Sequence, residues 1–333
     1  MKYISLFAGI GGFDLALDRL GHECVWANEW DKYATQIYRN RFNREIDARD
    51  IRLVETSDIP DFDLLVGGFP CQAFSIAGKR KGFEDTRGTL FFEIARIIKD
   101  KRPRYFLLEN VKGLLNHDSG KTFQTILATI NELGYECEWQ ILNSKNHGVP
   151  QNRERIFISG YIRGESRPEV LPIRFSNNKD IIQINNPKHS NNRFYGTDGL
   201  APALRTMQGG NRQPKIAIPT VNPDMVKIPE ATKKGYAEAT VGQAINLAVP
   251  NSKTRRGRVS DIAQTLDTGM QQYTLTEGYR IRRLTEIECE RLQGFPDQHS
   301  EGVSSTQRYK CLGNAVTVNV IYDICKGYPN EQH

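Results

Sequence analysis

The chain has 333 residues, of which 38% are hydrophobic and 25% are charged, a composition typical of a globular protein with a sizeable core. At ~150 residues per domain this length predicts about two domains, and no apolar run approaches the ~20 residues of a membrane span or resembles a leader, so we expect a soluble, cytoplasmic protein. Lysine and arginine exceed aspartate and glutamate by 45 − 39 = 6, which suits a polyanionic partner such as nucleic acid without requiring one.

Short apolar runs alternate with amphipathic stretches over the first half of the chain. The apolar runs predict strands at 3–7, 23–27, 64–66, 105–108 and 155–158. The amphipathic stretches predict helices at 13–20, 32–42, 90–99 and 122–133. Alternation of strand and helix is typical of a doubly wound, mostly parallel sheet covered on both faces, so we expect an α/β domain over 1–163.

The composition changes from about residue 161 to residue 278. Proline, asparagine, glycine and threonine become frequent and helical periodicity disappears, which predicts a second, smaller, loop- and strand-rich domain over 166–279. Segments that start at Asp198 and Asp261 share the pattern Ala-x-x-Leu-x-Thr, which indicates either two related hairpin-like elements or a chance match. Helical patterns return at 285–292 and 315–324, so we expect a return segment over 280–306 and a C-terminal helix within 307–330 that packs on the first domain.

The six cysteines are spaced too widely to form a recognisable metal site or disulfide framework. No CxxC pair or cysteine-histidine grouping occurs, so we expect reduced thiols and no bound metal. An isolated cysteine is most often a small hydrophobic residue of the core. The six are Cys24, Cys71, Cys137, Cys289, Cys311 and Cys325.

A glycine-rich block, Phe7-Ala-Gly-Ile-Gly-Gly-Phe-Asp, lies between a predicted strand and a predicted helix. Glycines there let a ligand approach the backbone amides at a helix N-terminus. The third glycine of the dinucleotide fingerprint is missing, which disfavours a nicotinamide dinucleotide. Glu29 follows the next apolar run, 20 residues after Gly9, where a carboxylate accepts hydrogen bonds from ribose hydroxyls. The alternative is a tight turn beside a solvated glutamate.

Three further candidates for chemistry follow or precede apolar runs of the predicted sheet. Cys71 lies in Gly-Phe-Pro-Cys-Gln, on a turn at the carboxyl edge where open parallel sheets bind ligands. Glu109 ends the next run, where burial would let a carboxyl group hold a proton, although a lone glutamate there is more often a cap or an ion-pair partner. Arg153 and Arg155 are either partners of Glu154 or donors to a substrate carbonyl, and spacing does not separate these roles.

Taken together, these blocks resemble the DNA (cytosine-5)-methyltransferase family of bacteria over about 1–160 and 280–325. The resemblance rests on the order of the blocks, since Pro-Cys-Gln alone would be weak. They are Phe-Ala-Gly-x-Gly-Gly, Asn28-Glu-Trp, Gly-Phe-Pro-Cys-Gln, Glu109-Asn-Val, Gln-x-Arg-Glu-Arg, Arg283-Leu-Thr, Glu290-Arg-Leu-Gln-Gly-Phe-Pro and Gly313-Asn-Ala-Val.

The resemblance implies methyl transfer from S-adenosylmethionine to cytosine C5, on a Rossmann-like fold. By resemblance, Cys71 is the nucleophile that adds to C6, Glu109 is the protonated acid at N3, and Arg155 holds O2 with Arg153 nearby. The same likeness implies a cofactor site in which the glycine loop brackets the amino-acid part, a carboxylate binds the ribose, and an indole stacks on the adenine. The implied cofactor-site residues are Phe7, Gly9, Gly11, Gly12, Glu29, Trp30, Asp50, Ile51, Leu90 and Asn314.

The resemblance also implies a double-stranded DNA substrate whose target cytosine is flipped out of the helix. Residues 71–88 resemble the family's mobile catalytic loop, and 166–279 would be its target-recognition domain. Each basic candidate is open to a plainer interpretation as a solvated or ion-paired side chain. The implied DNA contacts are Gln72, Ser75, Lys79, Arg80, Lys81, Arg87, Arg193, Arg205 and Thr265.

Two other functions fit parts of the same pattern. An RNA (tRNA) cytosine-5 methyltransferase would share the cysteine and the glutamate, but the Cys-Phe-Thr tripeptide of those relatives is absent here. A catalytically inactive DNA-binding relative is the second, and the presence of every catalytic block argues against it. The family further implies a bacterial or phage modification enzyme, expected to be monomeric, with a restriction endonuclease as a possible partner.

Overall fold

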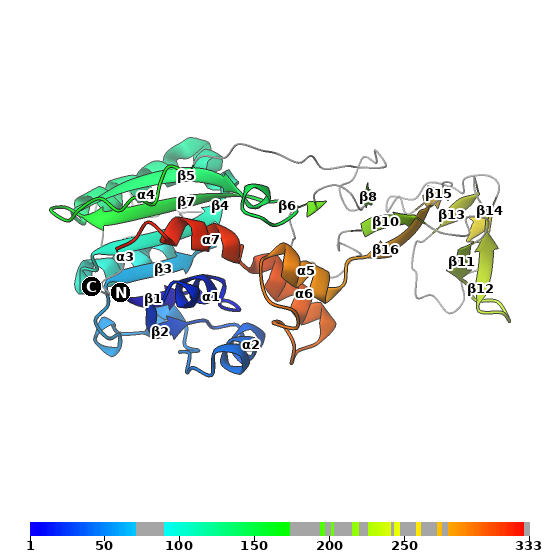
Figure 1. Ribbon diagram of the computed structural model, residues 1–333, viewed down its shortest axis with the longest axis horizontal. Helices are drawn as coiled ribbons and strands as arrows, with labels where there is room; N and C mark the ends of the chain where they lie inside the picture. The colour runs from blue at the N-terminus through cyan, green and yellow to red at the C-terminus, as the bar shows by residue number, and fades with distance from the viewer. Residues whose placement is uncertain are drawn as a thin grey trace. The chain divides into compact units, whose positions relative to one another are not determined.

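The computed structural model describes residues 1–70, 90–173, 194–196, 201–202, 215–219, 226–240, 243–246, 258–260, 272–274 and 279–329 (Figure 1). The chain divides into two compact units, and each is described by itself. The larger comprises Met1–Lys179, Leu200–Arg212 and Thr285–His333, and the smaller comprises Asp180–Gly199 and Gln213–Leu284.

A six-stranded, mostly parallel sheet forms the centre of the larger unit, with strand order β2-β1-β3-β4-β7-β5. The four strands from β2 to β4 run parallel, whereas β7 is antiparallel to β4 and β5 is antiparallel to β7. The expected doubly wound α/β class is confirmed. The strands are β1 (Lys2–Leu6), β2 (Glu23–Asn28), β3 (Leu64–Gly68), β4 (Tyr105–Val111), β5 (Tyr135–Asn143) and β7 (Glu154–Ile162).

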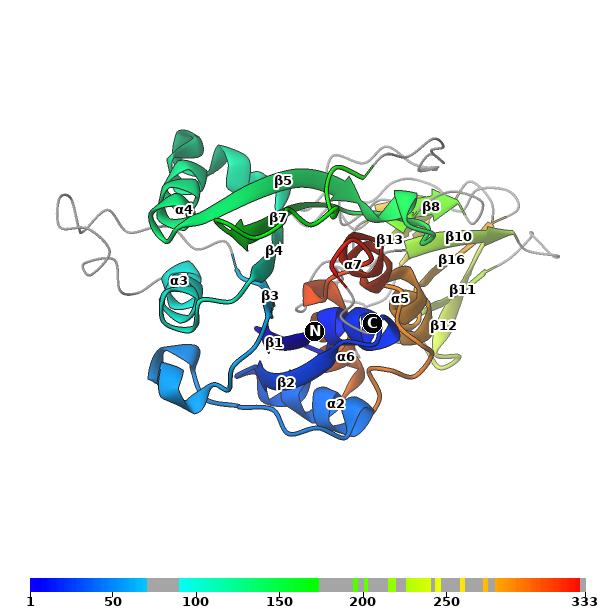
Figure 2. The same ribbon diagram turned by 60° about the vertical axis from the view of Figure 1, so that its left-hand side comes forward.

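Helices cover both faces of this sheet, with α3 and α4 on one side and α1 and α7 on the other (Figure 2). The main core joins the inward side chains of the strands to the apolar faces of α3 and α4, so the amphipathic spacing seen in the sequence corresponds to a buried helix face. The helices are α1 (Gly12–Arg19), α2 (Lys32–Phe42), α3 (Leu90–Lys101), α4 (Lys121–Glu132), α5 (Glu286–Leu292), α6 (Ser305–Asn314) and α7 (Val318–Cys325). The 3₁₀ turns are η1 (Ile51–Leu53), η2 (Thr56–Asp58), η4 (Lys112–Gly120) and η5 (Ser144–Asn146).

The last part of the chain returns to the sheet and differs in detail from the sequence-based expectation. Helix α5 begins with a capping box, in which Thr285 accepts from the Glu288 amide and Glu288 accepts from the Thr285 amide. The helix expected at 315–324 begins only at Val318, because Ala315 has an extended backbone. Helix α6 was not predicted. Tyr328, after α7, donates to the Phe106 carbonyl of β4 at 3.3 Å, which fastens this end to the sheet.

Most of the described residues of the smaller unit lie in strands. One sheet has the order β16-β10-β8, a second the order β14-β13-β15, and β11 with β12 forms a hairpin. A small core of Ile228, Ala239 and Ile245 joins the hairpin to β13. The strands are β8 (Phe194–Gly196), β10 (Lys215–Pro219), β11 (Val226–Pro229), β12 (Tyr236–Ala239), β13 (Ala244–Asn246), β14 (Val259–Ser260), β15 (Gln272–Thr274) and β16 (Tyr279–Arg283). A short pair in the larger unit, β6 (Gln151–Asn152) with β9 (Ala201–Pro202), completes the strands.

None of the helices in the described part of the chain has the length and apolar character that crossing a bilayer requires.

Candidate active site

The carboxyl ends of the parallel strands bring most of the described candidate residues to one edge of the sheet. The glycine loop follows β1, Glu29 and Trp30 follow β2, Phe69 follows β3, and Glu109 lies near the end of β4. In open α/β sheets, ligands bind outside the carboxyl ends of the strands. The four strand ends therefore form a candidate site.

The glycine loop after β1 has a backbone that requires its glycines. Phe7, Gly9 and Gly11 all have positive φ, of 52°, 58° and 83°. A side chain at Gly11 would collide with the ring of Phe42, and a Cβ at Gly12 would lie 2.6 Å from Val316 Cγ2. Helix α1 therefore begins with Gly11 as its N-cap, and no side chain bonds to that cap. The loop leaves backbone N–H groups at a helix N-terminus where an anionic ligand group binds well.

Glu29 is a buried carboxylate held in a fixed orientation by the backbone. Its Oε2 accepts from the Gly9 amide at 3.0 Å and its Oε1 accepts from the Asp31 amide at 2.8 Å. Burial raises the pKa of Glu29, while these backbone hydrogen bonds act in the opposite direction. Because a carboxylate oxygen can accept more than one hydrogen bond, both oxygens retain capacity for hydroxyl donors.

Asn28 brings the segment that carries Asp50 next to Glu29. Its Nδ2 donates to the carbonyls of Asp47 and Arg49, at 3.0 and 2.9 Å. The Glu29 amide donates to the same Asp47 carbonyl at 3.0 Å. The 47–49 segment is thus fixed along the end of β2. Asn28 was quoted in the sequence only as part of a motif and received no role there.

Three cofactor-site candidates in this region differ in exposure. Asp50 caps η1 by accepting from an amide, and its ion pair with Arg52 lowers its pKa. Ile51, the next residue, is buried. Trp30, by contrast, is 68% exposed, unusual for a tryptophan beside a buried carboxylate, so its ring is available for stacking on a planar ligand.

Glu109 is the buried carboxyl group at the end of β4. It pairs in register with Gly68 of β3 and Phe157 of β7. Its Oε1 lies 2.9 Å from Arg155 Nε, in an ion pair with only 10% of the glutamate side chain exposed. Burial raises the pKa of Glu109 above the usual carboxyl value, and the positive charges of Arg155 and Arg153 oppose that rise. The arrangement can hold a proton on the carboxyl group at a higher pH than in water.

The end of β3 is fixed against Glu109 and its neighbour Asn110. A Cβ at Gly68 would lie 3.1 Å from Glu109 Oε2, so only glycine leaves the carboxyl group its full space. Asn110 Nδ2 donates to the Phe69 carbonyl at 2.8 Å, and its Oδ1 accepts from the Val111 amide at 2.8 Å. These contacts determine the chain direction two residues before Cys71. Sequence reasoning assigned Asn110 no function, although its place after Glu109 in the Glu-Asn-Val block was the available signal.

Arg153 and Arg155 have different surroundings although they lie two residues apart. Arg153 is buried, and its Nη2 donates to the carbonyls of Gly313 and Ala315 at 3.2 and 2.8 Å. Burial, together with the charge of Arg155, lowers the pKa of Arg153 to about 9. Arg153 thus anchors the segment that flanks Asn314, whereas Arg155 pairs with Glu109.

The segment 313–316 forms a further wall of the site. Val316 lies against Gly12 and Gly68, and the exposed Asn314 is the last residue of α6. Gln293 Nε2 also donates to the Ala315 carbonyl, at 3.2 Å, so two buried side chains hold this segment. Leu90, the first residue of α3, is half-buried and packs against the main core that includes Ile51.

Ten of the candidate residues lie outside the described part of the chain, so the structure places none of them. They are the proposed nucleophile and the proposed DNA contacts, namely Cys71, Gln72, Ser75, Lys79, Arg80, Lys81, Arg87, Arg193, Arg205 and Thr265.

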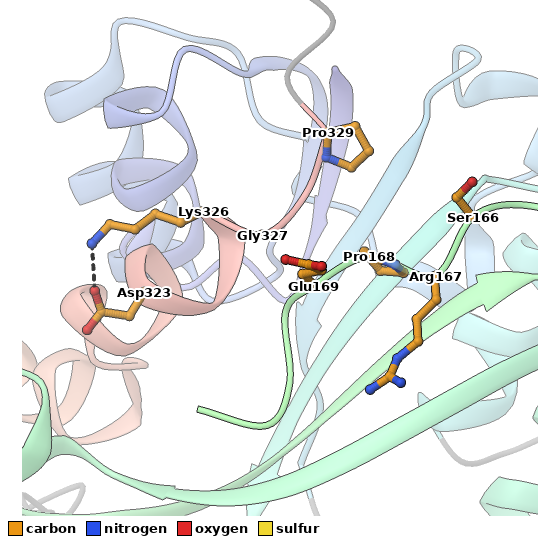
Figure 3. A pocket seen from close by; sticks show the side chains of 8 residues that line it. All are labelled: Ser166, Arg167, Pro168, Glu169, Asp323, Lys326, Gly327 and Pro329. Carbon is orange, nitrogen blue, oxygen red and sulfur yellow. Dashed lines mark hydrogen bonds and ion pairs between the residues drawn. The ribbon is translucent and has the colours of Figure 1, made fainter. Parts of the chain in front are cut away.

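A cavity of about 550 Å³ lies elsewhere in the larger unit (Figure 3). Its lining includes Arg167 and Glu169 after β7, with Asp323 and Lys326 from the end of α7. The end of β7 pairs with the beginning of β4, so this cavity lies at the edge where the parallel strands start. Lys326 pairs with Asp323 at 2.9 Å, and Arg167 pairs with Glu138. The cavity is therefore separate from the site formed by the strand ends.

Among the described residues, no group of three or more histidine, cysteine, aspartate or glutamate side chains is arranged to hold a metal ion.

Comparison with known proteins connects this geometry to a family. The family profile "C-5 cytosine-specific DNA methylase" matches residues 1–329. The Type II methyltransferase M.HhaI of Haemophilus parahaemolyticus is 37% identical over 96% of this chain and 92% of its own length. The Type II methyltransferase M.HpaII of Haemophilus parainfluenzae is 41% identical over 96% of this chain and 86% of its own.

Solved structures show the same fold. The Dnmt2 methyltransferase of S. pombe superposes with a TM-score of 0.61 over 98% of both chains, at 16% identity. The methyltransferase EhMeth of Entamoeba histolytica has a TM-score of 0.58 over 98% of this chain and 97% of its own, also at 16% identity.

Proposed function

The chain belongs to the C-5 cytosine-specific DNA methylase family, and from this premise we propose how its own residues transfer a methyl group to cytosine C5 in a specific double-stranded DNA sequence. The observation that carries the proposal is the buried Glu109–Arg155 pair beside the end of β3. That strand leads directly to the Pro-Cys-Gln block, so an acid and a thiol belong to neighbouring strand ends.

Cys71 is the proposed nucleophile. Cytosine C5 is a poor nucleophile, and addition of a thiolate at C6 converts the C5–C6 bond into an enamine-like system. The Sγ–C6 bond forms, and C5 would then take the methyl group as the donor's sulfur–methyl bond breaks and S-adenosylhomocysteine is left. A base removes the C5 proton, and the electron pair from the C5–H bond restores the C5–C6 double bond and expels the thiolate. Asn110 supports the start of this loop through the Phe69 carbonyl.

Glu109 is the proposed acid at cytosine N3. Addition of the thiolate places electron density on the ring, and a proton held at N3 stabilises it. Support comes from burial, which raises the pKa of this carboxyl group. Arg155 orients the carboxyl group through Oε1 and is the proposed donor to the cytosine O2. Arg153, which binds the 313–316 segment instead, is proposed to support the site rather than to touch the base.

The residues at the ends of β1 and β2 fit S-adenosylmethionine. They comprise a glycine loop at a helix N-terminus, a fixed carboxylate and an exposed indole, which suit an amino acid, a ribose and an adenine respectively. When bound, the cofactor supplies an electrophilic methyl group. Glu29 is proposed to accept from the ribose hydroxyls, Trp30 to stack on the adenine, and Asp50 with Ile51 to border its edge, with Leu90 and Asn314 in the same pocket.

The remaining parts of the proposal concern DNA and the cellular setting. The cytosine must leave the base stack to be reached, at a cost of a few kcal/mol. We assign base recognition to the expected second domain, 166–279, and closure over the base to residues 71–88. We also propose that the enzyme is a cytoplasmic monomer and that it works with a restriction endonuclease.

Bisulfite sequencing of a plasmid from cells that express the protein tests the proposal. We expect protected cytosines at every copy of one short sequence. In vitro, labelled methyl groups from S-adenosylmethionine should enter duplex DNA and not tRNA. If the plasmid has no protected cytosines and the label enters tRNA instead, the proposal is wrong and the protein modifies RNA.

A further inference from the structure

A buried histidine connects the C-terminal return of the chain to the glycine loop. His299 Nε2 lies 2.7 Å from the Ile10 carbonyl oxygen, and the two residues are 289 positions apart in the sequence. A carbonyl oxygen only accepts hydrogen bonds, so the histidine must donate from Nε2. His299 is 4% exposed, and Ile10 is 1% exposed. The bond is thus shielded from water that could replace it.

The ring of His299 is held on several sides. It stacks on Phe295 with ring centroids 4.4 Å apart, and Phe42 meets it edge-on at 6.1 Å. Phe42 is the same ring that covers Gly11. Arg41 Nε donates to the His299 carbonyl at 2.6 Å. The position of the imidazole therefore depends on α2 and on the 295–299 turn, and not on the glycine loop alone.

Burial keeps this imidazole neutral near pH 7. It lowers the pKa of His299 to about 4, with Arg41 and Arg19 acting in the same direction and the Ile10 carbonyl and Glu290 against it. A neutral imidazole carries one proton, and the bond to Ile10 requires that proton on Nε2. The structure therefore specifies the tautomer as well as the contact.

The Ile10 carbonyl is the point at which His299 contacts the backbone of the glycine loop. Ile10 lies between Gly9 and Gly11, which both have positive φ. Glycine adopts negative φ about as readily, so these two residues do not by themselves hold the backbone in this conformation. The Gly9 amide is the donor that orients Glu29. Loss of the His299 bond would leave a buried carbonyl unpaired and release the two glycines to adopt other conformations.

We infer that His299 is a positioning residue for the methyl-donor site: its Nε2–H fixes the Ile10 carbonyl and thereby the orientation of the Gly9 and Gly11 peptide groups. The inference rests on the proposed function of the glycine loop as the cofactor site. His299 itself does not need to touch the cofactor.

Four variants separate positioning from packing. His299→Phe keeps an aromatic ring and removes the donor. His299→Gln and His299→Met are unbranched and of similar length, and only glutamine can donate. His147→Phe is the matched control, because His147 is also a buried histidine but bonds to Asp323 on α7, at 2.8 Å. Binding of S-adenosylhomocysteine by calorimetry and the KM values for cofactor and DNA are measured for each.

We expect His299→Phe and His299→Met to weaken cofactor binding roughly tenfold and to raise the KM for cofactor, with the KM for DNA unchanged. His299→Gln should bind within about threefold of the wild type, and His147→Phe should lose stability without losing affinity. Equal affinities for the glutamine and methionine variants would overturn the inference. This comparison does not depend on the phenylalanine variant, so it holds even where that variant does not fold.

A second measurement needs no variant. Nitrogen-15 spectra of the wild-type protein should show His299 as the Nε2–H tautomer, and an Nδ1–H tautomer would contradict the inference. Failure of the wild type to bind S-adenosylhomocysteine would instead contradict the proposed cofactor site. The two failures are therefore distinguishable.

Discussion

Replacement of Glu109 by glutamine tests the acid at the centre of the site. The change keeps the size of the side chain but removes both the negative charge and the proton it can hold. Arg155 Nε lies 2.9 Å from Oε1, with 20% of the arginine side chain exposed, so solvent partly compensates the charge left behind. Loss of this charged hydrogen bond should lower the free energy of unfolding by about 1.5–3 kcal/mol. Breaking a fully buried ion pair would cost more, about 3–5 kcal/mol.

The effect of Glu109→Gln on catalysis should be larger than its effect on binding. The acid stabilises charge that develops only after the thiolate adds, and removal of one such group typically lowers kcat by about 10²–10³. Because Glu29 and Trp30 belong to other strand ends, the Kd for S-adenosylhomocysteine should stay within about twofold. Steady-state kinetics with labelled cofactor and calorimetry measure these quantities. The control is Glu154→Gln, a half-exposed carboxylate that pairs with Lys112 at 3.0 Å.

The same variant should change how stability depends on pH. The folded protein raises the pKa of Glu109, so over the window above about pH 4.5 the folded state holds a proton that the unfolded chain has released. The wild-type free energy of unfolding should therefore fall as pH rises through this window. Glu109→Gln removes this contribution, and its stability should decline less. A steeper decline in the variant, or an unchanged kcat, would refute the assignment of Glu109 as a buried acid.

Three other substitutions test neighbouring parts of the site. Gly68→Ala places a methyl group 3.1 Å from Glu109 Oε2 and should lower kcat about tenfold without changing cofactor affinity; a fully active variant in steady-state assays would show that the carboxyl group is not confined there. Asn110→Ala removes a 2.8 Å bond to the Phe69 carbonyl and should cost about 1–3 kcal/mol in denaturant unfolding, and an unchanged midpoint would argue against it. Glu29→Ala leaves two backbone amides without their acceptor and should weaken cofactor binding by about 100-fold, measured by calorimetry, while DNA binding in gel shifts is unchanged. A variant that binds the cofactor as tightly as the wild type would show that Glu29 is not part of the cofactor site.

Much of the sheet was predictable because its strands and helices have strong local signals. Helix α2 was predicted with its observed bounds, since Asp31 caps it by accepting from two amides and its apolar spacing is regular. The parallel strands β1, β3 and β4 are short apolar runs that are almost entirely buried, whereas the edge strand β2 is only partly buried. The family and the DNA cytosine-5 methylation that it implies are confirmed by the profile match and by the Type II relatives.

The elements that escaped prediction depend on contacts far apart in the chain. Strand β5 lies at the sheet edge with a mixed burial pattern, so its sequence lacks a continuous apolar run. Helix α6 has many polar residues and is held by tertiary contacts such as Lys310 with Asp31, at 2.7 Å. The contrast between Arg153 and Arg155 is of the same kind. Arg153 lies just before β7 and Arg155 lies within it, and the partner of each side chain is set by segments more than 40 residues away in the sequence.

The central claim, a transient bond between Cys71 and C6 of the target cytosine, is tested most directly by a trapping experiment. Duplex DNA with 5-fluorocytosine at the methylated position is incubated with the protein and S-adenosylmethionine. After methyl transfer, fluorine replaces the proton that must leave C5, so the thiolate cannot be expelled. The account predicts a stable protein–DNA adduct, mapped to Cys71 by mass spectrometry and absent from Cys71→Ser. Methylation of ordinary DNA without an adduct on the fluorinated duplex, or an adduct at another cysteine, would contradict it.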